Sequence, residues 1–199
     1  MNKNIVVALT GQSGAGKSSL GRYFASQGYT VIDCDEVAKD IHKDIYCQSE
    51  LCIAFGDDIV KDGTVDKQLL AKKAFADAES LAILTSITHP FIIRKILTDI
   101  ENAFNNGEKF VIVDGAVIIG HEFEKYCDKF IVVTCDRQKQ YERLVVRDNI
   151  SIEQAKNRIA KQTKLETMLN KADFIVYNNG TQQAMENQGA YILRTLNKM

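Results

Sequence analysis

The sequence has few of the features that mark export, metal binding or nucleic-acid binding. Its five cysteines form no Cys-x-x-Cys pair and do not have the spacing of a zinc site. Its formal net charge is -1, and it has no extended basic or acidic tail. The first apolar run, residues 5–9, is too short for a signal-peptide core or a membrane span. We therefore expect a cytoplasmic protein that acts on small molecules, without nucleic-acid or membrane partners.

Five short apolar runs predict the strands of one sheet. They are continuous rather than alternating, which is typical of parallel strands covered by helices on both faces. The runs lie at 5–9, 29–33, 109–114, 129–135 and 173–178. Because the segments between them are long enough for helical crossovers, the chain is predicted to have a doubly wound α/β fold.

One connection is longer than a crossover needs. Between residues 33 and 109 the sequence predicts several helices, with apolar residues recurring every three or four positions in "DKQLLAKKAFADAESLAILTSI". We expect a helical subdomain at about 55–106, inserted into a core formed by 1–54 and 107–199.

The stretch "GQSGAGKS" behind the first strand matches the P-loop pattern G-x-x-x-x-G-K-[ST]. Glycines allow the backbone N–H groups to converge on phosphate oxygens, and the following helix adds its positive end. Lys17 is expected to hold the outer phosphates and Ser18 to bind Mg²⁺. The predicted nucleotide-binding residues are Gly11, Gln12, Ser13, Gly14, Ala15, Gly16, Lys17, Ser18 and Ser19.

Aspartates follow two of the predicted strands. Asp33 and Asp35 are two residues apart, a spacing that points both carboxylates to one face of an extended segment. A kinase needs such a carboxylate to take the proton of the attacking hydroxyl. The alternative is structural, with Asp35 capping a helix and Asp33 a solvated strand end. Asp114 ends the third strand, where it would help to hold Mg²⁺.

Basic residues gather in a predicted helical lid at about 137–165. Residues 137–164 contain eight basic and three acidic side chains, and Gln140, Arg143 and Arg147 fall on one helix face. Guanidinium groups on a lid can close over a transferring phosphoryl group and exclude water. A solvated basic helix is the alternative, and the P-loop favours the lid.

Taken together, these motifs resemble those of the dephospho-coenzyme A kinase family along nearly the whole chain. The similar stretches include "ALTGQSGAGKSS", "YTVIDCDEVAKDI", "LTSITHPFI", "QYERLVVRD", "RIAKQ" and "ADFIVYNNG". The resemblance implies a three-layer P-loop kinase fold with a five-stranded parallel sheet, and ATP-dependent, Mg²⁺-requiring phosphorylation of the 3′-hydroxyl of dephospho-CoA.

The resemblance also implies residue roles. Asp35 would be the base, with Asp33 beside it, and Lys17, Arg143 and Arg147 would act on the phosphates. His89, Pro90 and Lys67 would lie on the acceptor side, and Asn178 and Asn179 near the adenine of ATP.

The sequence departs from the family pattern at several positions. Ala116 and Gly120 stand where the family has a proline and a glutamate, with Glu122 nearby, and Lys67 replaces an arginine. The P-loop interior reads "QSGA" instead of the commoner "GIGS". Two alternatives stay open: a related kinase acting on a nucleoside, nucleotide or sugar acid, and a nucleotide-binding regulator without catalysis.

Overall fold

The computed structural model describes residues 4–199 as two compact units. The first holds the chain up to Ile32 and from Ile100 onward, and the second holds Asp33–Asp99. The second unit thus begins earlier than the predicted insertion at 55–106. The reason is that Ile41, Cys47 and Leu51 share one apolar cluster with residues further along the same unit. The role of this unit as an acceptor subdomain stays a prediction.

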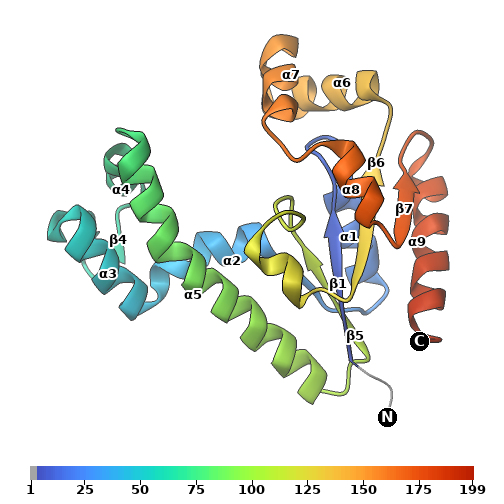
Figure 1. Ribbon diagram of the computed structural model, residues 1–199, viewed down its shortest axis with the longest axis horizontal. Helices are drawn as coiled ribbons and strands as arrows, with labels where there is room; N and C mark the ends of the chain where they lie inside the picture. The colour runs from blue at the N-terminus through green and yellow to red at the C-terminus, as the bar shows by residue number, and fades with distance from the viewer. Residues whose placement is uncertain (1–3) are drawn as a thin grey trace. The chain divides into compact units, whose positions relative to one another are not determined.

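The first unit contains the five-stranded sheet, in the order β2-β5-β1-β6-β7 (Figure 1). Its elements are β1 (Ile5–Thr10), α1 (Lys17–Ser26), β2 (Val31–Asp33), β5 (Phe110–Asp114), η3 (Glu122–Tyr126), β6 (Lys129–Thr134), α6 (Arg137–Asp148), α7 (Ile152–Ala160), α8 (Leu165–Lys171), β7 (Phe174–Tyr177) and α9 (Gln182–Leu196). β1 pairs in parallel with β5 and β6, and β6 with β7. The predicted α/β fold with a five-stranded parallel sheet is confirmed.

Alternating side chains of the strands build two cores, one on each face of the sheet. In β6, Ile131 and Val133 pack with the helices α1 and α9, whereas Val132 packs with Met168 of α8 on the opposite face. Since successive side chains of a strand point to opposite faces, both faces of this strand must be apolar. This explains the continuous apolar runs of the sequence and gives the three layers.

A side chain protects the outer edge of β7. The amide of Gln188 in α9 accepts from the backbone N–H of Tyr177 at 3.0 Å and donates to the carbonyl oxygen of the same residue at 3.1 Å. The N–H of the next residue, Asn178, points inward to Thr134 of β6. Gln188 therefore takes the place of a further strand at this point of the sheet.

The helices α6 and α7 form a small hairpin with its own apolar contact. Leu144 of α6 packs against Ala155 and Ile159 of α7. Ser151 and Gln154 form a capping box that begins α7, with reciprocal hydrogen bonds of 2.8 and 3.1 Å. These helices are the segment that the sequence predicts as a lid.

The second unit is built around a helical cluster and one short hairpin. Its elements are α2 (Cys34–Asp40), η1 (Ile41–Lys43), α3 (Ile45–Phe55), η2 (Asp57–Ile59), β3 (Val60–Lys61), β4 (Thr64–Val65), α4 (Lys67–Ala74) and most of α5 (Ala78–Asn105). β3 and β4 form an antiparallel pair that the sequence pattern did not predict. Asp62 and Gly63 form its turn with φ angles of 51° and 72°, the left-handed backbone that a tight hairpin requires.

The helix α5 has an apolar composition. Among residues 4–199 it is the one helix long and apolar enough to cross a membrane by those two criteria, which core helices of soluble proteins also meet. Phe91 and Ile96 on this helix are buried.

Candidate active site

The phosphate loop joins β1 to α1 and depends on its glycines. Gly16 caps α1 with φ 103°, and Gly14 has φ 81°, both in the left-handed region. A Cβ atom on Gly14 would lie 2.7 Å from the carbonyl oxygen of Gln140, and one on Gly16 would overlap the amide of Asn178. The loop therefore presents bare backbone at a helix N-terminus, which suits phosphate binding.

Lys17 and Asp114 meet directly under this loop. The Lys17 ammonium forms an ion pair with the Asp114 carboxylate, and their side chains are only 13% and 5% exposed. Asp114 ends β5, which lies beside β1 in the sheet. The structure thus brings together two of the predicted site residues. The binding of outer phosphates by Lys17 stays a prediction.

The surroundings of Asp114 suit a magnesium ion. A Cβ atom on Gly21 would lie 2.9 Å from Asp114 Oδ2, so α1 packs closely on this carboxylate. Ser18 precedes Gly21 by one turn on the same helix face. Within residues 4–199 no group of three or more His, Cys, Asp or Glu side chains could hold a metal ion by itself. A carboxylate and a hydroxyl are nevertheless the hard oxygen ligands that Mg²⁺ takes together with phosphates and water.

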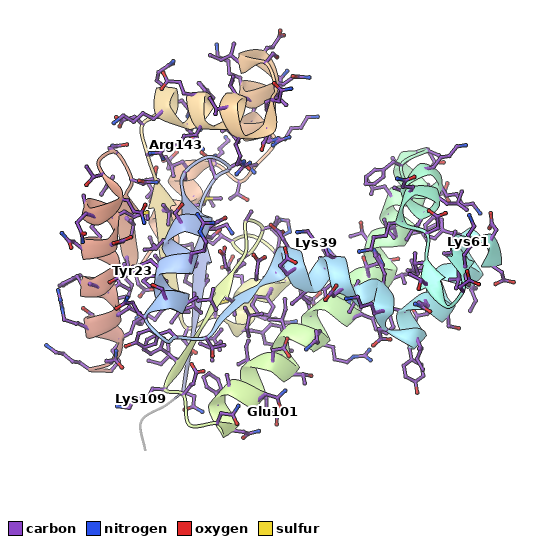
Figure 2. All side chains as sticks on the ribbon, turned by 180° about the vertical axis from the view of Figure 1, so that it is seen from behind. Tyr23, Lys39, Lys61, Glu101, Lys109 and Arg143 are labelled. Atoms are coloured by element: carbon purple, nitrogen blue, oxygen red, sulfur yellow. The ribbon has the colours of Figure 1, made fainter. Side chains whose placement is uncertain are left out.

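One of the two predicted lid arginines contacts the loop. Figure 2 labels Arg143, which belongs to α6. Its guanidinium donates to the carbonyl oxygens of Gly14, Ala15 and Asn178 at 3.5, 3.4 and 3.0 Å. Arg147 instead donates to Asp148, at 2.7 Å from Nε. The two arginines differ because a carboxylate lies beside Arg147 in the sequence, and a bidentate ion pair satisfies its guanidinium locally.

The two asparagines after β7 connect the loop to the start of α6. Asn178 donates from Nδ2 to the carbonyl oxygen of Ala15 at 2.8 Å. Asn179 exchanges two hydrogen bonds of 2.7 Å with Asp136, the residue before α6. Asn178 thus contacts the loop and Asn179 contacts the residue before α6, and the contact of both with adenine stays a prediction.

The two polar side chains inside the P-loop reach the chain segment between α7 and α8. Gln12 donates to the carbonyl oxygen of Thr163 at 3.0 Å, and the backbone N–H of Ser13 donates to Gln162 Oε1 at 3.0 Å. Gln162 ends the stretch "RIAKQ", which resembles the family, but its contact with Ser13 spans 149 positions of the chain, and no local pattern indicates that contact.

In the second unit, Asp33 and Asp35 have different environments. Asp33 Oδ1 accepts from the backbone N–H groups of Asp35 and Glu36 at 2.8 and 3.2 Å, so Asp33 is the N-cap of α2. The prediction that both carboxylates extend from one strand face is wrong, because the chain becomes helical at Cys34. The alternative that Asp35 is the cap is wrong as well. Asp35 lies in the first helical turn and is exposed.

The other acceptor-side residues are also found in the second unit. Lys67 begins α4 and donates to the carbonyl oxygen of Lys39 at 2.7 Å. Burial lowers the pKa of His42, and the charge of Lys67 lowers it further. His89 and Pro90 are exposed on α5. Their binding of an acceptor stays a prediction.

Comparison with known proteins assigns the chain to a family. The family model for dephospho-CoA kinase matches residues 5–184. The chain belongs to the dephospho-CoA kinase family. A dephospho-CoA kinase of Corynebacterium glutamicum is 33% identical over 189 residues, which cover 94% of each chain.

Solved structures agree with this membership. A dephospho-CoA kinase from Campylobacter jejuni has a TM-score of 0.70 at 26% identity, and a protein from Thermus thermophilus has 0.79 at 25%, each covering 98% of both chains. The predicted family and its three-layer P-loop kinase fold are confirmed. As a member of the dephospho-CoA kinase family, the chain is a phosphotransferase that uses ATP.

The departure from the dephospho-CoA kinase pattern after β5 has a local structure of its own. Gly120 has φ 82°, and its N–H donates to Glu124 Oε2 at 2.6 Å. This hydrogen bond is the main cause that holds the pKa of Glu124 below its usual range, and a hydrogen bond with Lys171 lowers that pKa further. Glu122 pairs with Lys125 at 3.1 Å. Glu124, rather than Glu122, is the glutamate that orders this loop.

Proposed function

We propose that this protein transfers the γ-phosphoryl group of Mg²⁺-ATP to the 3′-hydroxyl of dephospho-CoA, giving coenzyme A and ADP. The observation that carries the proposal is the phosphate loop with the Lys17–Asp114 pair at its base and Arg143 at its rim, in a chain of this family. Such an arrangement supplies positioning and positive charge, which are what phosphoryl transfer needs from a protein. The scattered positions of the five cysteines, which form no Cys-x-x-Cys pair, support a reducing, cytoplasmic setting.

The phosphate loop and α1 would hold the nucleotide and its metal ion. Ser18 and Asp114 would bind Mg²⁺, which neutralises charge on the phosphates. Lys17 would then exchange part of its contact with Asp114 for phosphate oxygens. The loop carbonyls to which Arg143 donates are neutral acceptors, so the positive charge of Arg143 is available to a phosphoryl group close to the loop.

The second unit would bind the acceptor. Asp35 has an exposed carboxylate in the first turn of α2, and we propose that this carboxylate accepts the proton of the 3′-hydroxyl. Asp33 would support it through the cap, because its side chain binds the N–H of Asp35. Lys67, His89 and Pro90 are the remaining candidates for acceptor contacts.

A coupled assay tests the reaction. Purified protein with Mg²⁺-ATP and dephospho-CoA should form coenzyme A and ADP in equal amounts, and an acceptor-free control should form little ADP. Formation of ADP without coenzyme A would instead indicate another acceptor, as in a related small-molecule kinase. Absence of both products would favour a regulator without catalysis.

The role of Asp35 is tested by Asp35→Asn. Loss of a general base should lower kcat by about a hundred-fold or more, and ATP binding should be nearly unchanged. Asp57→Asn, which removes another exposed carboxylate of the same unit, is the matched control. Wild-type turnover in the Asp35 variant would remove the base assignment.

A further inference from the structure

The segment 161–164, between α7 and α8, contacts the phosphate loop at two adjacent residues. Gln12 donates to the carbonyl oxygen of Thr163. Ser13 contacts Gln162 twice: its backbone N–H donates to Oε1 at 3.0 Å, and its hydroxyl accepts from Nε2 at 2.7 Å. One glutamine side chain therefore satisfies both the main chain and the side chain of Ser13.

The contact of Gln162 differs in kind from the other contacts between the lid and the loop. Gln140 and Arg143 donate hydrogen bonds to the loop, with Gln140 Nε2 lying 2.7 Å from the carbonyl oxygen of Ser13. Phosphate oxygens accept hydrogen bonds and do not bind carbonyl oxygens, so these contacts are compatible with a bound nucleotide. Gln162 instead accepts the N–H of Ser13, and backbone N–H groups are what a P-loop offers to phosphate.

We propose that Gln162 lowers the affinity of the P-loop for the nucleotide, because its amide oxygen competes with a phosphate oxygen for the N–H of Ser13. When ATP binds, a phosphate oxygen replaces Gln162 Oε1 on this donor, and the Gln162 amide separates from Ser13. The contacts of Gln140 and Arg143 with the loop carbonyls are kept.

The strengths of the two hydrogen bonds explain why the exchange is possible. The bond from Ser13 to Gln162 joins two neutral groups, whereas a bond to phosphate is charge-assisted and about twice as strong. The nucleotide therefore displaces the glutamine, but its affinity is reduced by the free energy of the bonds that it breaks. Gln162 should thus affect the Kd and KM for ATP more than kcat.

The proposal rests on the proposed function only in requiring that ATP binds at the P-loop. Binding is therefore measured on the full chain without acceptor, by titration calorimetry with Mg²⁺-ATP, and kcat and KM are measured separately. The variants are Gln162→Leu, which removes both hydrogen bonds, and Ser13→Ala, which removes the hydroxyl and keeps the N–H. Gln138→Leu is the matched control, since Gln138 binds Glu142 on the exposed face of α6.

Gln162→Leu should bind ATP about three- to ten-fold more tightly than wild type, as expected from the loss of one or two neutral hydrogen bonds. Ser13→Ala should show a smaller change in the same direction, and Gln138→Leu should show none. Gln162→Glu should bind ATP more weakly, because a carboxylate beside Ser13 repels phosphate. Thermal denaturation of each variant checks that it is folded.

Two results would overturn the proposal. Weaker ATP binding by Gln162→Leu would mean that Gln162 contacts the nucleotide itself, and unchanged binding by both Gln162→Leu and Ser13→Ala would mean that no competition exists. Either result leaves the proposed function intact. Failure of the wild-type protein to bind ATP would reject the proposed function, and the role of Gln162 with it.

Discussion

At the scale of single residues, Asp33 and Asp35 show how two identical side chains acquire different tasks. Asp33 ends β2 and binds two N–H groups in the first turn of α2. Asp35 contributes its N–H to that cap, so its own carboxylate is available for other contacts. The structure therefore shows Asp33 as the helix cap, and the role of Asp35 as the base stays a prediction.

Substitutions at Asp33 should separate capping from charge. Asp33→Ala should lower the free energy of unfolding by about 1 kcal/mol, whereas Asp33→Asn, which still caps, should lower it by only a few tenths. Urea denaturation measures the difference. Asp35→Asn serves as the control and should leave the free energy of unfolding near that of wild type. Equal losses for the two Asp33 variants would mean that the cap contributes little.

The sequence predicts residues that belong to a local pattern better than those that depend on distant partners. The P-loop could be predicted because eight consecutive positions carry it. Helical spacing could place Gln140, Arg143 and Arg147 on one face. It could not show that Arg147 forms an ion pair with Asp148. The contact of Gln162 with Ser13 joins residues that are 149 positions apart, and no helical or strand period encodes it.

At the scale of elements, the strands of the sheet could be predicted from the sequence, whereas the hairpin β3–β4 could not. A buried parallel strand is apolar on both faces, so each strand of the sheet is a visible run. β3 and β4 contain two residues each, too few to show any alternation. Their remaining signal is the Asp62-Gly63 turn, which is typical of a tight hairpin.

An ion-pair cluster joins the helices α6 and α7 to each other. Asp148, the last residue of α6, binds Arg147 and also Arg158 of α7. These two arginines hold the pKa of Asp148 below its usual range, through hydrogen bonding to Arg147 first. A carboxylate with a lowered pKa in the folded protein stabilises it above the unfolded pKa, and this contribution is lost as the pH falls through the folded pKa.

Asp148→Asn should therefore loosen α7 at neutral pH without unfolding the sheet. Hydrogen exchange should become faster in residues 152–160 and stay unchanged in β1 and β5. In the wild-type protein the same change should appear only on acidification below about pH 4, near the ordinary pKa of an aspartate. Glu142→Gln, which alters an exposed acid of α6, is the control. Equal exchange in the two variants would show that the cluster does not hold α7.

At the scale of the whole molecule, each unit has its own apolar core. Leu51, Ile59 and Phe91 are buried together in the second unit, whereas Leu9, Phe24 and Ile192 are buried together in the first. Cys47 lies in the core of the second unit. Burial, with the charges of Asp44 and Glu50, raises the pKa of its thiol to about 11. At neutral pH this thiol is protonated and shielded, so it reacts only when its unit opens.

Leu51→Ala should destabilise the second unit by about 3 kcal/mol through the cavity that it creates. Iodoacetamide labelling of Cys47, followed by mass spectrometry, should become much faster, while ATP binding should be retained because the P-loop belongs to the other unit. Ile192→Ala, a cavity in the first unit, is the control and should leave labelling slow. Parallel loss of ATP binding and Cys47 protection in Leu51→Ala would show that the units unfold as one.

The amide of Gln188, a residue of α9, covers part of the edge of β7, and this affects how the chain associates with other copies of itself. An edge strand offers free backbone groups to any other extended chain, which is how sheets join and aggregates begin. The paired hydrogen bonds between Gln188 and Tyr177 occupy the backbone groups of the last residue of β7, close to the exposed side chain of Ile175. One glutamine side chain thus leaves fewer backbone groups at this edge open to pairing with a second copy of the chain.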